Sequence, residues 1–173
     1  MDLLYTMDEK YLQAIEELYY GELPKALHLF NEIVNADPNY ARAYYQLGSF
    51  YNYQFKDYQT AGFYYKKCIE LEPDFPDVYE HYLKLLMVLK MHKTVEQLSQ
   101  QALKVNGVRQ DHIYESLGLY AETEQNYTLA KAHFQRAALI APSTKTRDEL
   151  QEHLQRIQNK LKAKQQMVYA YQG

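Results

Sequence analysis

The chain has 173 residues, a formal net charge of −3 and a single cysteine. This length fits one domain or two small ones, and a lone cysteine excludes an internal disulfide and a cysteine-based zinc site. Apolar residues make up 47% of the chain and charged residues 24%, as in ordinary globular proteins and unlike disordered ones. The longest uncharged apolar runs, such as 85–89, are too short to cross a bilayer. The N-terminus lacks the basic start and long apolar stretch of a secretory signal, so we expect a cytoplasmic protein without membrane insertion.

Charge is distributed unevenly along the chain. Residues 1–75 carry 12 acidic and six basic residues, whereas residues 143–173 carry three acidic and six basic ones. No segment forms the basic patch that holds nucleic acid by neutralising its phosphates, so we expect no nucleic-acid partner. The acidic front and the basic tail favour head-to-tail contact between copies of the chain.

A period of 34 or 35 residues repeats through the chain. Ala26, Ala61, Val95 and Ala130 follow one another at intervals of 35, 34 and 35 residues. Three further columns keep this period: Phe30, Tyr65, Ser99, Phe134; then Ile33, Cys68, Ala102, Ala137; then Ala14, Gly48, Leu83, Gly118. Repetition at this period predicts helix pairs that bury their apolar faces by stacking on one another.

Each repeat is predicted to form two amphipathic helices. Over residues 40–53 apolar side chains recur at steps of three and four residues, which is the helical period. Asp57 is a suitable N-cap for the next helix, and Pro73 requires that helix to end before it. We expect helices over about 7–19, 22–36, 40–54, 57–71, 76–90, 92–105, 111–123 and 126–140.

The C-terminal segment has a different pattern. Thr146 and Glu149 have the spacing of a capping box, which predicts that a helix begins there. An apolar stripe follows at Leu150, Leu154, Ile157 and Leu161. We interpret this helix as a cap that covers the last repeat. A seam for self-association or for a partner is the alternative, in the apolar end formed by Met167, Val168, Tyr169 and Tyr171.

The second and fourth units resemble the tetratricopeptide repeat (TPR). The residues that carry the resemblance are Tyr44, Leu47, Gly48, Tyr51, Ala61, Tyr65, Cys68 and Pro73, and then Tyr114, Leu117, Gly118, Ala121, Ala130, Phe134, Ala137 and Pro142. In the third unit Leu83, Val95 and Ser99 replace the usual glycine, alanine and aromatic residue. The resemblance implies an all-α fold, an α-solenoid in which about nine helices form a right-handed superhelix of antiparallel pairs. It implies a single domain over 1–173, with repeats over about 7–40, 41–75, 76–110 and 111–144 and a capping helix over about 146–168.

Neither catalytic nor cofactor motifs are found. The sequence has no glycine-rich phosphate loop, no nucleophile elbow and no His-Glu-x-x-His pair, and its six histidines are never three or four residues apart. Cys68 falls on the inner side of a helix, where a buried structural thiol is expected. We therefore expect no enzyme activity, no metal and no cofactor.

The resemblance also implies a concave groove, lined by the first helix of each repeat, that binds a protein or peptide segment. Transferring the groove positions gives Tyr11, Ile15, Tyr19, Arg42, Tyr45, Ser49, Asn52, Tyr53, Asp77, Glu80, Lys84, Glu115, Leu119 and Glu122, with Asp8, Met87 and His112 beside them. Tyrosines would form an aromatic wall in the first half and carboxylates an acidic second half. We expect a partner segment with apolar or proline residues and a basic end. Tyr11 and Ile15 occupy the places of the lysine and asparagine that clamp chaperone tails in some TPR proteins, so we do not expect that activity.

The leading interpretation is a scaffold or adaptor that holds a partner segment. One alternative is a secretion-type or assembly chaperone that holds a client protein, because small acidic TPR proteins include such chaperones. Another is an assembly subunit whose main role is to form a homo-oligomer through its acidic front and basic tail.

Overall fold

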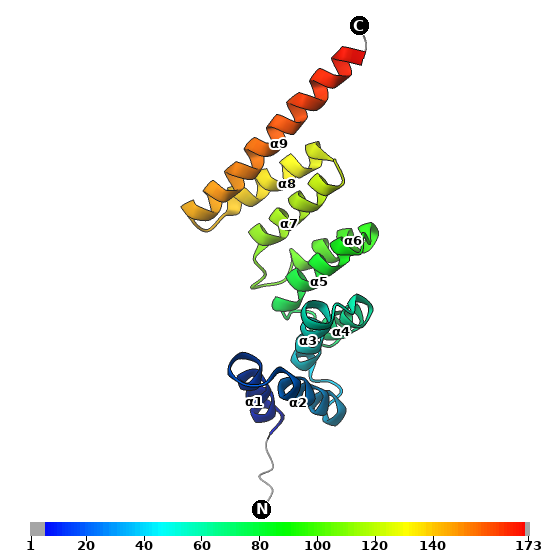
Figure 1. Ribbon diagram of the computed structural model, residues 1–173. Helices are drawn as coiled ribbons and strands as arrows, with labels where there is room; N and C mark the ends of the chain where they lie inside the picture. Colours follow the sequence, from blue (N-terminus) through cyan, green and yellow to red (C-terminus); the bar gives the residue numbers. More distant parts are fainter. Residues whose placement is uncertain (1–5, 172–173) are drawn as a thin grey trace, which may run out of the picture. The chain divides into compact units, whose positions relative to one another are not determined.

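The computed structural model describes residues 6–171, and the side chains as far as residue 166. Within this range the predicted all-α fold is confirmed, because every regular element is a helix and no strand occurs. The described elements, shown in Figure 1, are α1 (Met7–Tyr20), α2 (Leu23–Ala36), α3 (Ala41–Ser49), the π-helical segment η1 (Phe50–Phe55), α4 (Tyr58–Leu71), α5 (Asp77–Val88), α6 (His92–Ala102), α7 (Gln110–Thr123), α8 (Tyr127–Ile140) and α9 (Thr144–Tyr171). The chain divides into two compact units, Met1–Val95 (unit 1) and Glu96–Gly173 (unit 2), each described by itself below.

Short polar residues begin several of the helices. Thr6 and Glu9 form a capping box at α1, in which the Glu9 amide donates to Thr6 Oγ1 over 3.2 Å. Asp57 caps α4 as predicted, because its side chain accepts a hydrogen bond from the Thr60 amide at 3.1 Å. The predicted capping box at Thr146 is wrong. Helix α9 begins two residues earlier, and Ser143 Oγ accepts from the Thr146 amide at 3.1 Å.

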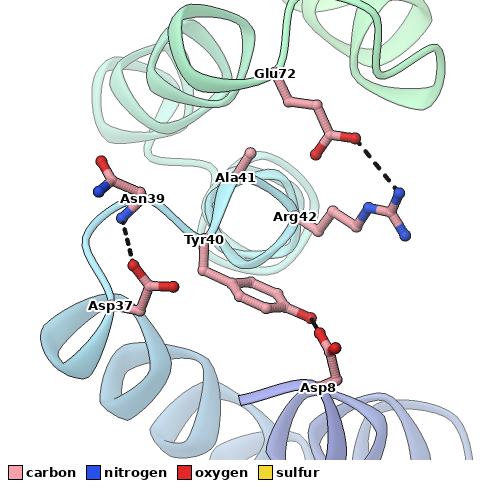
Figure 2. Close-up of a pocket in the computed structure, with 7 residues that line it drawn as sticks. All are labelled: Asp8, Asp37, Asn39, Tyr40, Ala41, Arg42 and Glu72. Atoms are coloured by element: carbon pink, nitrogen blue, oxygen red, sulfur yellow. Dashed lines mark hydrogen bonds and ion pairs between the residues drawn. The ribbon is translucent and has the colours of Figure 1, made fainter.

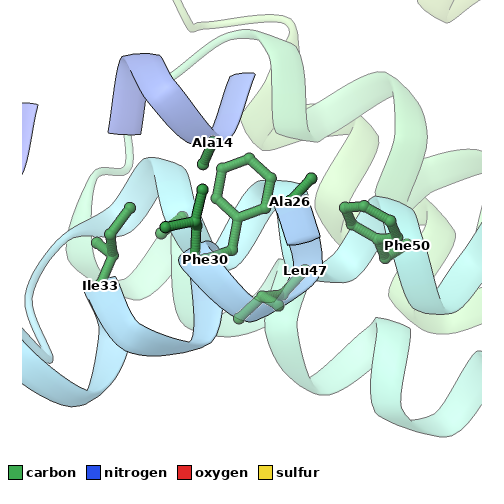
Figure 3. Close-up of a cluster of buried hydrophobic side chains, with 8 residues drawn as sticks. Ala14, Ala26, Phe30, Ile33, Leu47 and Phe50 are labelled. Carbon is green, nitrogen blue, oxygen red and sulfur yellow. The ribbon is translucent and has the colours of Figure 1, made fainter. Parts of the chain in front are cut away.

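Unit 1 is built from helix pairs that share one apolar cluster. Helix α1 packs on α2, α3 on α4, and α2 also packs on α3. Ala14 and Ala26 are fully buried, and small side chains at these positions let α1 and α2 approach closely. Phe30 fills the space beside them and lies 6.2 Å from Phe50, measured between ring centroids (Figure 3). The alanine columns of the sequence therefore mark helix crossings.

The glycines in the repeat columns allow an equally close approach. A Cβ atom on Gly48 would lie 2.6 Å from the Tyr65 ring, and one on Gly118 would lie 2.7 Å from the Phe134 ring. Both aromatic rings are fully buried. Any larger residue at these two positions would push the helices of the pair apart.

Unit 2 contains a second apolar cluster, formed by α7, α8 and α9. Phe134 and Ala137 of α8 are fully buried, and Leu150, Leu154 and Ile157 of α9 pack against them. The apolar stripe of the C-terminal segment is therefore part of the core of this unit. Figure 1 shows α9 continuing past the beginning of α8.

The helix predicted over 40–54 is interrupted. Helix α3 ends at Ser49, and the next turn is the π-helix η1, whose wider turn rotates the side chains that follow. Phe50 and Asn52 point inward as a result and are 4% and 7% exposed. Tyr51, one of the residues that carry the TPR resemblance, is only half-buried. Asn52, predicted to face the groove, instead lies 3.5 Å from the Tyr65 hydroxyl, to which its amide donates.

Candidate partner-binding surface

Aromatic side chains in or beside the first helices of the repeats in unit 1 form two groups of contacting rings. We call the two groups together the aromatic surface, and its members are Tyr11 with Tyr40, and Tyr45 with Tyr53, Phe75 and His81. The rings of Tyr11 and Tyr40 lie 5.4 Å apart between centroids, and Gln46 Nε2 donates to the Tyr11 hydroxyl at 3.2 Å. The Tyr45 ring meets both Phe75 and His81 edge-on, at 5.4 and 5.6 Å. These contacts give the rings fixed positions.

Tyr53 is the most exposed ring of this surface. Its side chain is 44% exposed, and its hydroxyl is hydrogen-bonded to His81 Nδ1 at 2.7 Å. The ring also contacts the His81 ring at 5.6 Å between centroids. The bond joins η1 to α5, so it holds the Tyr53 ring in place while leaving much of it open to solvent. An exposed, rigid aromatic ring with a polar tip is well suited to recognition.

Burial shifts the acidities of the aromatic surface. Loss of solvent around Tyr45 raises its pKa, and the nearby Asp77 carboxylate raises it further. Burial likewise raises the pKa of Tyr11, although the hydrogen bond from Gln46 acts in the other direction. Burial lowers the pKa of His81, with the Glu80 charge opposing it. Near neutral pH the surface therefore holds neutral phenols and a neutral imidazole.

A polar pocket of about 360 Å³ adjoins the aromatic surface at Tyr40. Its walls are Asp8, Asp37, Asn39, Tyr40, Ala41, Arg42 and Glu72, shown in Figure 2. The Tyr40 hydroxyl donates to Asp8 Oδ1 at 2.8 Å, and Arg42 Nη2 donates to Glu72 Oε1 at 3.4 Å. The Arg42 guanidinium also lies over the Phe75 ring, 5.6 Å from its centroid. Arg42, predicted to line the groove, is thus exposed but paired within the chain.

The predicted groove residues of α5 include one ion pair and one carboxylate outside any ion pair. Lys84 Nζ donates to Glu80 Oε1 at 2.6 Å, so these two charges compensate each other. Asp77 is exposed in the first turn of the helix. Within residues 6–171, neither Asp77 nor Asp8 forms an ion pair. Two carboxylates on this side of unit 1 therefore carry uncompensated negative charge.

The remaining predicted residues of unit 1 differ in exposure. Ile15 packs against the core cluster, and Ser49 is half-buried, with its hydroxyl accepting from Tyr65 at 3.4 Å. Tyr19 is 70% exposed, beside the Tyr20 ring at 6.4 Å. The predicted groove residues of unit 1 thus include rings of the aromatic surface, the partly buried Ile15 and Ser49, and the exposed Tyr19 near the end of α1.

In unit 2 the acidic residues predicted for the groove contact α9. Glu122 accepts from Arg156 Nε at 2.9 Å and from Lys160 Nζ at 2.7 Å. The Arg156 guanidinium beside it lowers the pKa of Glu122 to about 2, and Lys160 adds to this effect. Glu115 lies 3.3 Å from His153 Nε2, and Leu119 is 40% exposed. Of the two carboxylates predicted for this part of the groove, Glu122 is therefore compensated by basic residues of α9.

Sequence reasoning missed several aromatic residues. Tyr40, Phe75 and His81 were not among the predicted groove residues, and Phe75 lies in a loop before a proline. It also missed an outer aromatic cluster, formed by Tyr51, Phe55, Phe63 and Tyr64, whose neighbouring rings lie 5.3 to 5.4 Å apart. The excess of tyrosine over other aromatic residues could have indicated these clusters. The π-helix η1, which the sequence pattern does not predict, determines which of the rings lie on the same face.

Cys68 is buried, and desolvation raises the pKa of its thiol to about 12, so the reactive thiolate is not populated near neutral pH. Over 6–171 no group of three or more His, Cys, Asp and Glu side chains could hold a metal ion. In the same range, no helix has the length and apolar character needed to span a bilayer.

The described residues form an all-helical fold of packed helix pairs, and one of the repeats matches a known family. Residues 41–75, which include α3, η1 and α4, match the family model of the tetratricopeptide repeat. No curated protein sequence gave a match.

Several solved structures share this fold. Human IFIT1, solved as a dimer with PPP-AAAA, aligns with a TM-score of 0.77 at 20% identity over 92% of this chain. The chain spans 41% of the length of that protein. Pseudomonas aeruginosa PilF aligns with a TM-score of 0.73 at 17% identity, over 96% of this chain and 72% of its own. PilW, a type IV pilus biogenesis factor, aligns at 0.69 with 15% identity, over 88% of this chain and 78% of its own. At these identities the likeness establishes a TPR-like helical solenoid fold.

Proposed function

We propose that this chain is a non-enzymatic scaffold and that the aromatic surface of unit 1 binds a peptide or helix of a partner protein. The main support is the Tyr53 ring, which is 44% exposed and yet fixed by its hydrogen bond to His81. A ring held in this way loses little conformational freedom when a partner covers it. The TPR-like fold adds support, because such folds typically serve protein–protein interaction.

The charges around the aromatic surface favour a particular kind of partner segment. The carboxylates of Asp8 and Asp77 form no ion pair in the described part of the chain, whereas Arg42 and Lys84 are both paired. A segment with apolar or proline residues and a basic end would place its cations near these carboxylates. Phosphate groups would be repelled there, so the proposal excludes nucleic acid as the partner.

Peptide binding with matched variants tests this proposal. The probe is an array of peptides with alternating proline and aliphatic residues that end in lysine, and a second array that ends in glutamate. We expect the lysine series to bind selectively and Tyr53→Ala to weaken that binding at least tenfold, about 1.4 kcal/mol. Phe63→Ala is the control, because it removes an aromatic ring of similar exposure (62%) from the outer aromatic cluster.

Unfolding must be separated from loss of binding. If Tyr53→Ala leaves both the melting temperature and peptide binding unchanged, the aromatic surface is not the site. Equal binding of the lysine and glutamate series would contradict the assigned charge preference. A cytoplasmic location is part of the same proposal, and fractionation of cells that produce the tagged chain tests it.

A further inference from the structure

The last turns of α9 extend beyond the helix that supports them. Leu150 and Ile157 are buried against α8, but residues 162–166 are all exposed. The last described contacts with α8 are made by Lys160 and Lys164, whose ammonium groups lie 5.6 and 5.9 Å from the Tyr127 ring centroid. Tyr127 is the first residue of α8, so α9 continues past the beginning of that helix, as Figure 1 shows. We call residues 162–171 the α9 tail.

The apolar stripe of α9 breaks at Lys164, and apolar residues follow in the tail. Leu150, Leu154, Ile157 and Leu161 are separated by four, three and four residues, and the same alternation leads on to Lys164, Val168 and Tyr171. The C-terminal end of α9, the helix segment that contains Val168 and Tyr171, continues past the beginning of α8 (Figure 1). Residues 162–166 are exposed, and Lys164 contacts only the first residue of α8 among the contacts described. A helix segment with so little packing gains little stability in water, so we expect this extension to have a binding role.

The charges of the tail complement those of unit 1. No acidic residue follows Glu152, and Lys162 and Lys164 lie in the tail itself. Unit 1 carries 14 acidic and nine basic residues, whereas unit 2 carries eight acidic and ten basic residues. Unit 1 is therefore net negative and unit 2 net positive. The uncompensated carboxylates of Asp8 and Asp77 flank the aromatic surface, to which the ammonium groups of the tail could bind by both charge and cation–π attraction.

We propose that the α9 tail of one copy of this chain binds the aromatic surface of unit 1 in a second copy. This inference rests on the proposed function and names the partner as the chain itself. The tail has the apolar and basic residues that the surface is suited to bind. Because the two contacting surfaces differ, each bound copy retains one unused tail or one unused aromatic surface. Association is therefore head-to-tail, and it continues into open chains unless a ring closes.

Sedimentation velocity over a range of protein concentration tests the association. Between about 1 and 200 μM we expect the mass of the full chain to rise with concentration at about 0.05 M salt, and to fall towards the monomer at about 0.5 M salt. A chain that ends at Leu161 keeps the buried α9 residues and should remain monomeric throughout.

Charge variants give a matched comparison in the same measurement. Asp8→Asn with Asp77→Asn should weaken association at least tenfold. Glu22→Gln with Glu70→Gln removes two charges elsewhere on unit 1 and should change association less than twofold. An equal loss in both double variants would overturn the proposal, because net charge alone would then explain association.

Binding of the tail in trans separates this proposal from the proposed function. The probe is a fluorescein-labelled peptide of residues 158–173, added to the chain that ends at Leu161 and followed by fluorescence anisotropy. We expect binding that Tyr53→Ala weakens at least tenfold and Phe63→Ala less than twofold.

Three results would overturn the proposal. The first is a shortened chain that does not bind the tail peptide, even if it binds the lysine-ended array peptides, in which case only the proposed function stands. The second is a monomeric full chain that binds the peptide at least tenfold more weakly than the shortened chain, because the tail then occupies its own unit 1. The third is association that persists without the tail.

Discussion

Gly48 and Gly118 show how single atoms set the spacing of a helix pair. Each lies on the first helix of its pair and faces a buried ring of the second, Tyr65 or Phe134. Gly62 differs, because a Cβ atom there would meet only Leu85 Cδ2, at 4.0 Å. The chain thus contains both required and replaceable helical glycines.

We expect Gly118→Ala to lower the free energy of unfolding by about 1–3 kcal/mol, because overpacking exceeds the gain in helix propensity. Gly62→Ala should raise it by about 0.5–1 kcal/mol, because nothing opposes that gain. Urea denaturation of both variants measures the two changes. If both substitutions changed the free energy of unfolding in the same direction, close approach of the helices would not be the reason for a glycine at position 118.

Glu122 makes the stability of unit 2 depend on pH. Its pKa in the folded chain, about 2, lies below the ordinary value of 4.5 because of Arg156 and Lys160. Its contribution is therefore fully present above about pH 5 and is lost as the pH falls towards 2. Since the carboxylate is 10% exposed, the network should be worth more than an exposed ion pair and less than a fully buried one.

We expect Glu122→Gln to destabilise the chain by roughly 1–2 kcal/mol at pH 7, because two cations lose their partner. The difference from the parent chain should shrink between about pH 5 and pH 2. Chemical denaturation at several pH values measures it, with Glu149→Gln on the exposed side of α9 as the control. A difference that stays constant over this range would contradict the assigned pKa.

At the scale of the elements, the helices could be predicted from sequence because their signals are local and repeated. Residues such as Asp57 and Pro73 mark ends, and the alanine and glycine columns mark crossings. The π-helix η1 could not be predicted, since its wider turn depends on how α3 and α4 pack rather than on any residue pattern. That turn buries Asn52, which was predicted to face the groove, and leaves Tyr53 exposed.

The turns inside three repeats share a backbone feature. Lys56, Lys90 and Gln125 all adopt a left-handed conformation, with φ of 57°, 54° and 58°. They are 34 and 35 residues apart, so the feature belongs to the repeat itself. Residues with a Cβ atom are strained in this region, and glycine is not.

We expect Gln125→Gly to raise the free energy of unfolding by about 1 kcal/mol, because it relieves the left-handed strain at the turn between α7 and α8. Glu124→Gly is the control. The φ of Glu124 is −82°, so glycine there should give no gain and should cost chain entropy. Thermal unfolding of the two variants measures the effect, and a loss of stability in Gln125→Gly would refute it.

Across the whole molecule, most contacts join helices that are neighbours in sequence. In unit 2, α8 packs on both α7 and α9, and in unit 1 each pair packs on the next. Stability in such an arrangement is nearly a sum of local terms. The sequence could reveal this periodic architecture, but the pairing of Glu122 with Arg156 and Lys160 joins residues 34 and 38 positions apart, and no local pattern encodes that.

We expect Ile157→Ala to loosen unit 2 without affecting unit 1. Its fully buried side chain packs in the cluster of α8 and α9, and truncation should cost about 2–5 kcal/mol. Hydrogen exchange measured by mass spectrometry should speed up in α7, α8 and α9 and stay unchanged in α1 to α4. Faster exchange throughout both units would show that they unfold as one.

The hydrogen bond between Tyr53 and His81 has a practical consequence. The chain contains 19 tyrosines and no tryptophan, so its ultraviolet emission comes from phenol rings alone. The Tyr53 ring is partly exposed to solvent, and its hydroxyl is hydrogen-bonded to the His81 imidazole. Its fluorescence intensity should therefore change when a ligand covers the ring. A ligand without aromatic residues can therefore be titrated by the intrinsic signal of the unlabelled protein.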